Sequence, residues 1–307
     1  MNKENIEIVP VPPGGMSERN GVGPRDGGTV RLFLRKYSEN RAALVGTAIV
    51  SFLVAVAVAA PLITPYAPMG MSASPLLAPN AAHPMGTDDL GRDIFSQFLY
   101  GARTSCIVGV IAAAISTTLG VLLGAISGYW GGRIDDIIQR ITEMFSIIPR
   151  YFLAMVTVAI LGNSMLNIII VIGVLSWPAT TKLTRAEFAT LKTRSFVDAA
   201  KMTGAGSWSI IFDEILPNAM PPIVVQTILT ISAAMLLEAT LSFLGLGDPN
   251  VVSWGLMLNK AQGFLTLAPW MAIFPGVGIS LIILGLNLMG DGLNQALNPR
   301  LRREAKA

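Results

Sequence analysis

Charged residues are scarce in this chain of 307 residues, and cysteine and histidine are nearly absent. Only 13% of the residues are Asp, Glu, Lys or Arg, while 52% are hydrophobic. A soluble domain of this length needs more charge on its surface, so the composition favours a membrane protein. The mean hydropathy of +0.59 agrees with this interpretation. The small net charge of +3, without a basic stripe, argues against nucleic-acid binding.

Several kinds of catalytic site lack the residues that they need. Cys106 is the only cysteine, which excludes an intramolecular disulfide. His83 is the only histidine and is expected in an external loop, which disfavours an intramembrane hydrolase and a metal centre. No glycine precedes a lysine, so the phosphate-binding loop GxxxxGK[ST] is missing. We therefore expect no catalytic residue, no metal ion and no bound cofactor in this chain.

Six apolar runs are long enough to cross a membrane as helices. Alternating strand patterns are missing, and lipid otherwise admits only helices. Five of the runs are 42–63, 104–129, roughly 134–162, 222–246 and 269–289. The fourth in chain order begins near Asn167 and runs through Trp177 and Pro178 into the basic stretch "TKLTRAEF". At 1.5 Å per residue, a run of 22 residues reaches about 33 Å. The third run is the weakest because Glu143 and Arg150 interrupt it, and without it the count is five and the termini lie on opposite sides.

The distribution of lysine and arginine predicts the orientation of the spans. With a cytoplasmic amino terminus, 18 of the 22 Lys and Arg residues fall in cytoplasmic segments. External loops hold Arg92 and Lys260, while Arg103 and Arg150 lie in or beside the membrane. Short loops rich in these residues stay in the cytoplasm, so both termini are expected there. The first 40 residues are polar and show no signal-peptide pattern, so the first span is expected to remain as an anchor.

A polar segment, "DAAKMTGAGSWSIIFDEILPN" (198–218), separates two spans on the expected cytoplasmic side. The pattern predicts a helix over 187–203 that ends at Gly204 in the left-handed conformation. Ser207 is expected to cap a second short helix, which Pro217 ends. Both helices are amphipathic and too short to cross the bilayer. An ordinary solvated loop is the alternative, but a docking surface better explains about 35 ordered residues.

Five stretches of the sequence resemble a known family. "DAAKMTG", followed after nine residues by "EILP", resembles the cytoplasmic coupling loop of ABC importer permeases, with Asp198 in place of the usual Glu and Glu214 in place of an Ile. The other stretches are "HPMGTDDLGRDIFSQFLYGARTS" from position 83, "LEATLSFLGLG" from 237, "SWGLMLN" from 253 and "NLMGDGLNQALNPRLR" from 287. Together they resemble the second permease subunit of the dipeptide/oligopeptide importer family, over residues 30–303.

This resemblance implies an all-α, polytopic membrane protein with six transmembrane helices. Five spans would form the permease core of a type I ABC importer (MetI-like), preceded by one N-terminal span. The implied segments are an N-terminal transmembrane helix with a periplasmic loop (31–103), the permease core (104–303) with its coupling loop (187–220), and a cytoplasmic tail (304–307). The tail over 1–30 has no counterpart in the resemblance, and its polar composition predicts a disordered cytoplasmic segment. The implied location is the bacterial cytoplasmic membrane, with both termini in the cytoplasm.

The resemblance also implies the partners. A second, homologous permease would complete a heterodimer, two cytoplasmic ATPase subunits would bind ATP and Mg²⁺, and an extracytoplasmic solute-binding protein would deliver the substrate. Membrane lipid surrounds the spans, and no nucleic acid is expected. The implied cargo is di- or oligopeptides, although related importers carry glutathione or nickel complexes. A secondary transporter is the alternative from another class, disfavoured because the two halves show no repeated broken-helix pattern.

Candidate site residues fall into three groups. For ATPase coupling they are Asp198, Ala199, Ala200, Gly204, Ser207, Leu216 and Pro217. For the translocation path they are Glu143, Arg150 and Glu238, since ionisable groups in membranes usually face a bundle interior or a wet cavity. For docking of the binding protein they are Asp88, Asp89, Arg92 and Asp93.

The path and docking candidates each have a structural alternative. Glu143 and Arg150 are seven residues apart, which places them on one helical face, but Arg150 can also snorkel or form a structural pair. Glu238 can instead bind hydroxyl groups such as those of Thr240 or Ser232. The docking group can instead cap an interfacial helix that begins at Thr87 or Asp88.

The predicted topology is testable by cysteine labelling after replacement of Cys106. Single cysteines at Thr29, Ser207 and Ala305 should react only from the cytoplasmic side. Cysteines at Ser74 and Gln262 should react only from outside, because the positive-inside rule places these loops there. A Ser207 cysteine that a membrane-impermeant maleimide labels from outside would contradict the orientation.

Overall fold

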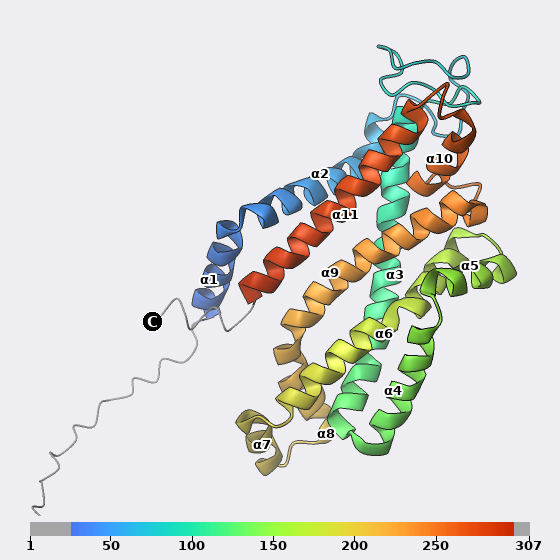
Figure 1. Ribbon diagram of the computed structural model, residues 1–307. Helices are drawn as coiled ribbons and strands as arrows, with labels where there is room; N and C mark the ends of the chain where they lie inside the picture. Colours follow the sequence, from blue (N-terminus) through green and yellow to red (C-terminus); the bar gives the residue numbers. More distant parts are fainter. Residues whose placement is uncertain (1–25, 298–307) are drawn as a thin grey trace, which may run out of the picture.

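The computed structural model describes residues 26–297, which fold almost entirely into helices (Figure 1). Within this range, β-structure is limited to two isolated bridges in the loop before α3. The helices are α1 (Asp26–Glu39), α2 (Arg41–Ile63), α3 (Ile94–Trp130), α4 (Gly132–Ile147), α5 (Arg150–Leu161), α6 (Met165–Leu191), α7 (Ser195–Met202), α8 (Ser207–Ser209), η1 (Ile210–Ile215), α9 (Leu216–Leu241), η2 (Ser242–Leu246), α10 (Trp254–Ala261), η3 (Gln262–Phe264) and α11 (Trp270–Leu297). The predicted all-α fold class is confirmed.

All six predicted apolar runs fall on helices. Five continuous helices are long and apolar enough to cross a membrane: α2, α3, α6, the helix over residues 207–246, and α11. The weakest predicted span is instead the pair α4 and α5, which meet at 84°. The protein therefore has five candidate spans, or six if this bent pair is one span.

The bend between α4 and α5 follows from the sequence. Pro149 has no N–H group, and its ring disfavours a helical conformation in the preceding residue. Ile148 is accordingly extended, with φ −74° and ψ 129°, and Arg150 begins a new helix. The expectation of one helix over roughly 134–162 is wrong for this reason.

The helix α3 begins earlier than the apolar run that predicts it. It has 37 residues, and Asp93 caps its first turn by accepting hydrogen bonds from the N–H and hydroxyl groups of Ser96, each at 2.7 Å. The prediction that Thr87 or Asp88 starts a helix here is therefore wrong. The Asp88 carboxylate instead accepts the backbone N–H groups of Leu90 and Arg92, each at 2.9 Å, and closes a turn.

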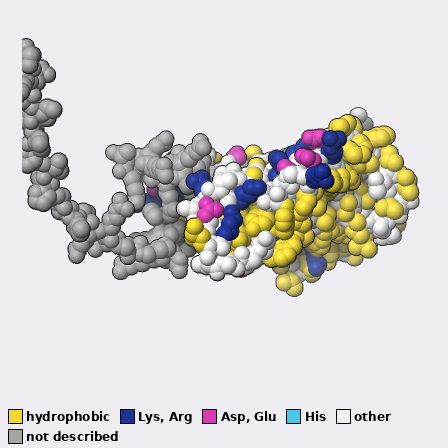
Figure 2. Space-filling model, turned by 90° about the horizontal axis from the view of Figure 1, so that it is seen from below, with side chains coloured by type: hydrophobic (Ala, Val, Ile, Leu, Met, Phe, Trp, Pro, Cys, Tyr) yellow, Lys and Arg dark blue, Asp and Glu magenta, His cyan; other side chains and the backbone are white. Residues whose placement is uncertain are grey.

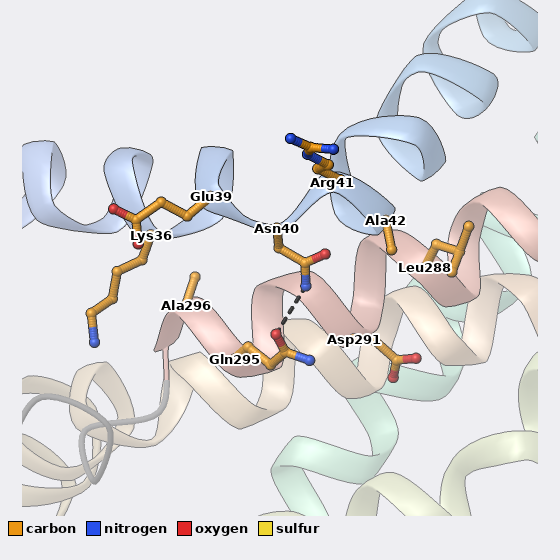
Figure 3. A pocket seen from close by; sticks show the side chains of 9 residues that line it. All are labelled: Lys36, Glu39, Asn40, Arg41, Ala42, Leu288, Asp291, Gln295 and Ala296. Carbon is orange, nitrogen blue, oxygen red and sulfur yellow. Dashed lines mark hydrogen bonds between the residues drawn. The ribbon is translucent and has the colours of Figure 1, made fainter. Parts of the chain in front are cut away.

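The N-terminal helices pack against the end of the chain. Residues 26–30, predicted to belong to a disordered tail, form the start of α1, which lies beside α11. Asn40 caps α2 by accepting the N–H of Ala43 at 3.1 Å, and its amide donates to Gln295 of α11 at 2.9 Å (Figure 3). This hydrogen bond joins the start of α2 to α11, a contact that the amino-acid composition does not reveal. Residues 1–25 and the predicted tail 304–307 lie outside the described residues.

The elements predicted to lie on opposite sides of the membrane are at opposite ends of the fold. Figure 1 shows the loop over 64–93 and α10 at one end, and α7 and α8 at the other. The helices α2 and α11 run side by side between them, with Gly46 of α2 directly against the backbone of Gly285. The end with α7 and α8 is the one that the lysine and arginine distribution assigns to the cytoplasm.

A row of glycines brings α3 and α6 into close contact. Gly120, Gly124 and Gly128 of α3 face α6, at positions four residues apart and therefore on one helical face. A Cβ atom on Gly124 would lie 2.6 Å from the Cβ of Thr184 and 2.7 Å from a carbonyl oxygen of α6. Small residues at such spacing let two membrane helices approach closely, since hydrophobicity alone does not drive their association in lipid.

We expect the substitution Gly124→Val to destabilise this helix pair. Overpacking a tight contact against a backbone carbonyl costs about 1 to 3 kcal/mol. The matched control is Gly276→Val on α11, where a Cβ meets no atom within 4 Å. Thermal unfolding of the purified chain in detergent should show a lower midpoint for Gly124→Val than for Gly276→Val. Equal midpoints would contradict the role of this glycine row.

Candidate functional site

The polar segment between α6 and α9 begins with a break that the sequence does not reveal. The predicted helix over 187–203 is interrupted at residues 192–194, so α6 ends at Leu191 and α7 begins at Ser195. Phe188 and Val197 are both fully buried in one hydrophobic cluster. On a continuous helix, side chains nine residues apart would point in opposite directions. The break lets both side chains enter the same cluster.

The end of α7 matches its prediction. Gly204 has φ +81°, the left-handed conformation that favours glycine. The N–H of Ala205 donates to the carbonyl of Ala200 at 3.1 Å, and the N–H of Gly204 donates to that of Lys201 at 3.0 Å. This pair of bonds is a Schellman motif, which satisfies the last carbonyl groups of a helix.

The second helix of the segment differs from its prediction. Gly206, not Ser207, precedes the first turn, and no side chain caps it. Pro217 does not end the helix, because the π-helical turn η1 precedes it and the N–H of Leu216 bonds to Ile211 five residues earlier. The helix continues through Pro217 into α9, so residues 207–246 form one helix of 40 residues. The polar segment is therefore a direct extension of a span.

The segment has a hydrophobic core of its own. Val197 of α7 and Ile210, Ile211 and Ile215 are buried together with Phe188. Of the seven predicted coupling residues, five are exposed: Asp198, Ala199, Gly204, Ser207 and Pro217. Ala200 and Leu216 are instead partly buried against this core. Their role as surface contacts stays a prediction, but their packing also stabilises the segment itself.

Three exposed hydrophobic residues lie on the same segment without having been predicted. Met202 is 90% exposed, Trp208 58% and Phe212 46%. The Trp208 ring contacts the Trp130 ring at the end of α3, with centroids 5.2 Å apart. Figure 2, which shows this end of the molecule, has hydrophobic side chains beside charged ones. The pattern "WSIIF" could have indicated exposed hydrophobic residues from the sequence, because only some of its apolar side chains can lie on one buried helical face.

An ion pair joins the helices behind this segment. The guanidinium group of Arg185 on α6 donates two hydrogen bonds to the Asp135 carboxylate on α4. Ser127 of α3 also donates to Asp135. The Lys192 ammonium group donates to the Tyr129 carbonyl at 3.2 Å. Bidentate Arg–carboxylate pairs have a defined geometry, so they hold the ends of α3, α4 and α6 together.

The first two path candidates do not share one helical face. Glu143 lies on α4 and Arg150 on α5, on either side of the 84° bend. The Glu143 side chain is exposed, and the Arg150 guanidinium lies 5.9 Å from the centroid of the Tyr151 ring. The common face expected for them is wrong because the span is broken, and their place in a path stays a prediction.

The third path candidate, Glu238, is buried with only 3% of its surface exposed. Its carboxyl oxygens accept hydrogen bonds from Ser242 at 2.7 Å and from Ser105 of α3 at 3.2 Å. Glu238 does bind hydroxyl groups, as expected, but these groups belong to residues other than the expected Thr240 and Ser232. Thr240 donates to the carbonyl of Leu236 on its own helix instead.

The docking candidates are partly structural. The Asp88 and Asp93 side chains are buried, and Asp93 also bonds to Nδ1 of His83 at 2.8 Å. Asp89 and Arg92 are partly exposed. Burial lowers the pKa of Lys260 on α10, and the charge of Arg92 adds to this effect, while Asp88 and Asp89 oppose it. Docking stays a prediction for all four candidates, although Asp88 and Asp93 clearly stabilise the loop.

A metal centre has no counterpart in the described part of the chain. Between residues 26 and 297, no three His, Cys, Asp or Glu side chains are arranged to hold a metal ion.

Comparisons with known proteins cover both the spans and the polar segment. Residues 120–303 match the family described as "Binding-protein-dependent transport system inner membrane component". Residues 29–82 match the family described as "N-terminal TM domain of oligopeptide transport permease C". The first match includes more than half of the chain.

Individual relatives match along most of the chain. "Dipeptide transport system permease protein DppC" of Haemophilus influenzae is 40% identical over 275 residues, which cover 87% of this chain and 93% of that protein. The protein of the same name in Alkalihalophilus pseudofirmus is 40% identical over 292 residues, covering 93% and 96%. "Glutathione transport system permease protein GsiD" of Pectobacterium atrosepticum is 38% identical over 275 residues, covering 89% and 91%.

Proposed function

Since the chain belongs to the family of binding-protein-dependent transport system inner membrane components, we propose that it is the permease subunit of an ATP-driven importer of di- and oligopeptides. The observation that carries this proposal is the similarity to two dipeptide permeases over about nine tenths of the chain. The chain is a multi-pass membrane protein with five or six spans. Its part in transport is to form half of the translocation path.

The polar segment supports coupling to an ATPase. Its exposed residues include Met202, Trp208 and Phe212, and hydrophobic surface of this kind favours contact with another protein. The segment is continuous with α9 and packs against Phe188 of α6. A partner that moves the segment therefore moves two spans. In this proposal the partner is a pair of cytoplasmic ATPase subunits, which bind ATP and Mg²⁺.

The other partners follow from the same proposal. A second, homologous permease completes the path, and an extracytoplasmic solute-binding protein delivers the substrate. The chain lies in the bacterial cytoplasmic membrane with both termini in the cytoplasm. The clustering of lysine and arginine at one end of the spans supports this orientation.

Glutathione is the second candidate substrate. A glutathione permease is 38% identical to this chain over nearly the same length. Glutathione is itself a small peptide, so one path can suit both substrates in size and polarity. Two dipeptide permeases at 40% identity make di- and oligopeptides the first choice.

Reconstitution in proteoliposomes tests the proposal. The chain is purified together with its sister permease, ATPases and binding protein, and uptake of a labelled dipeptide, a labelled tetrapeptide and labelled glutathione is measured. Uptake should require ATP on the side of the membrane that the ATPase subunits face. It should not respond to proton or sodium gradients. Gradient-driven uptake without ATP would instead indicate a secondary transporter.

We expect Gly204→Val to uncouple this transporter. The left-handed conformation costs a non-glycine residue about 1 to 2 kcal/mol, so valine should distort the end of α7. A Cβ on Gly204 meets no atom within 4 Å, so the effect comes from the backbone alone. Substrate-stimulated ATP hydrolysis should fall, while membrane insertion and pairing with the sister permease remain.

Two control substitutions separate strain from added bulk. Gly204→Asn should retain more stimulated hydrolysis, because asparagine tolerates the left-handed conformation. Gly206→Val adds the same side chain where φ is −71° and no atom lies within 4 Å, so it should have little effect on the backbone. Equal activity of Gly204→Val and Gly206→Val would contradict the proposed cause.

A further inference from the structure

Glu238 lies where three helices meet, near the end of the molecule that carries the loop over 64–93. The carboxyl group receives hydrogen bonds from Ser105 of α3 and from Ser242, which follows α9. Ser253, the N-cap residue of α10, lines the same small cavity as Glu238. One buried carboxyl group thus faces α3, α9 and the start of α10.

The short helix α10 is packed tightly against this junction. Trp254 is fully buried, and its indole N–H donates to the carbonyl of Phe98 on α3 at 3.0 Å. Gly255 lies directly on α9, where a Cβ atom would come 2.5 Å from the carbonyl oxygen of Ala239. The position of α10 therefore depends on close contacts immediately around Glu238.

The charges near the junction do not compensate an ionised Glu238. Among residues 26–297, Glu238 takes part in none of the ion pairs. Arg103 of α3 is exposed, and Asp248, which lines the same cavity, accepts the N–H groups of Met165 and Asn250, each at 3.0 Å. An unpaired charge in such a buried site is strongly destabilising, and two hydroxyl donors offset this cost only in part.

We propose that Glu238 is an uncharged positioning residue that holds α10 against α3 and α9. A neutral carboxyl group accepts the two serine hydroxyls and has one O–H to donate within the cavity. Glu238 then acts through α10 and not as a charged lining of the path. This inference rests on the proposed function for the orientation of α10 toward the outside of the membrane.

Accessibility of α10 in the assembled transporter tests the inference. The reporter is Met257→Cys, 5% exposed on α10, with Cys106 replaced by serine. Labelling by a membrane-impermeant maleimide from outside is measured in proteoliposomes that contain all subunits, together with basal and substrate-stimulated ATP hydrolysis. The variants are Glu238→Leu, which removes the hydrogen-bonding group, and Glu238→Gln, which keeps an uncharged one of similar size.

We expect Glu238→Leu to raise the labelling rate about tenfold and to lower the ratio of stimulated to basal hydrolysis, because the buried serine hydroxyls lose their acceptor. Glu238→Gln should rescue both readouts to near the parent values. The matched control is Thr240→Val, which removes a hydroxyl that bonds only within α9, and it should resemble the parent.

Two results would overturn the inference. If Glu238→Gln labels as fast as Glu238→Leu, the ionised form is the one that the site requires. If Glu238→Leu labels like the parent, Glu238 does not position α10. Only complexes that co-purify with the ATPase subunits are compared, so misfolded chains do not enter the result. A parent complex that labels slowly but transports no peptide would contradict the proposed function. The labelling rates of the Glu238 variants would still decide whether Glu238 positions α10.

Discussion

Lipid offers no hydrogen bonds to the backbone, so each spanning segment must satisfy its own N–H and C=O groups. At two prolines of this chain, the backbone satisfies that requirement in opposite ways. Before Pro217 the chain shifts to the π-helical turn η1, and the helix continues into α9. At Pro149 the preceding residue is extended and the helix breaks by 84°. The helix α4, which precedes the break, carries Asp135, Gln139 and Glu143, and these residues suit a less apolar setting than a lipid-facing span.

The same constraint decides where polar side chains lie. Ionisable side chains with partners gather at the two ends, with Asp93 and His83 in the loop over 64–93 and Asp135 and Arg185 behind the polar segment. Between these ends, the buried hydroxyls of Ser176, Thr181 and Thr230 bond to carbonyl oxygens of their own helices. Close helix contacts there depend on glycine, as between α3 and α6. Glu238 departs from this arrangement, and it does so at the junction that holds α10.

The parts of the structure that follow from local chemistry could be predicted from the sequence. Apolar length indicates the spans, and Gly204 indicates the end of α7, because each depends on neighbouring residues alone. The parts that depend on distant residues could not. Ser105 is 133 residues from Glu238, and nothing in either sequence neighbourhood indicates that they bond. The break before α7 likewise follows from a cluster that Phe188 and Val197 share with residues of the next helix.

Motion of the polar segment should reach several helices as one body. The segment is continuous with α9 and packs through its core against α6, while glycines hold α3 against α6 and the Asp135–Arg185 pair holds α4 to α6. Tightly packed helices shift together because their contacts have few intermediate arrangements. Relative movement is then easier where contacts are sparse, which here means α5 beyond the Pro149 bend, where Ile160 and Leu161 are exposed. Under the proposed function, an ATPase that displaces the segment would therefore move α3, α4, α6 and α9 together and change their relation to α5 and to a second permease.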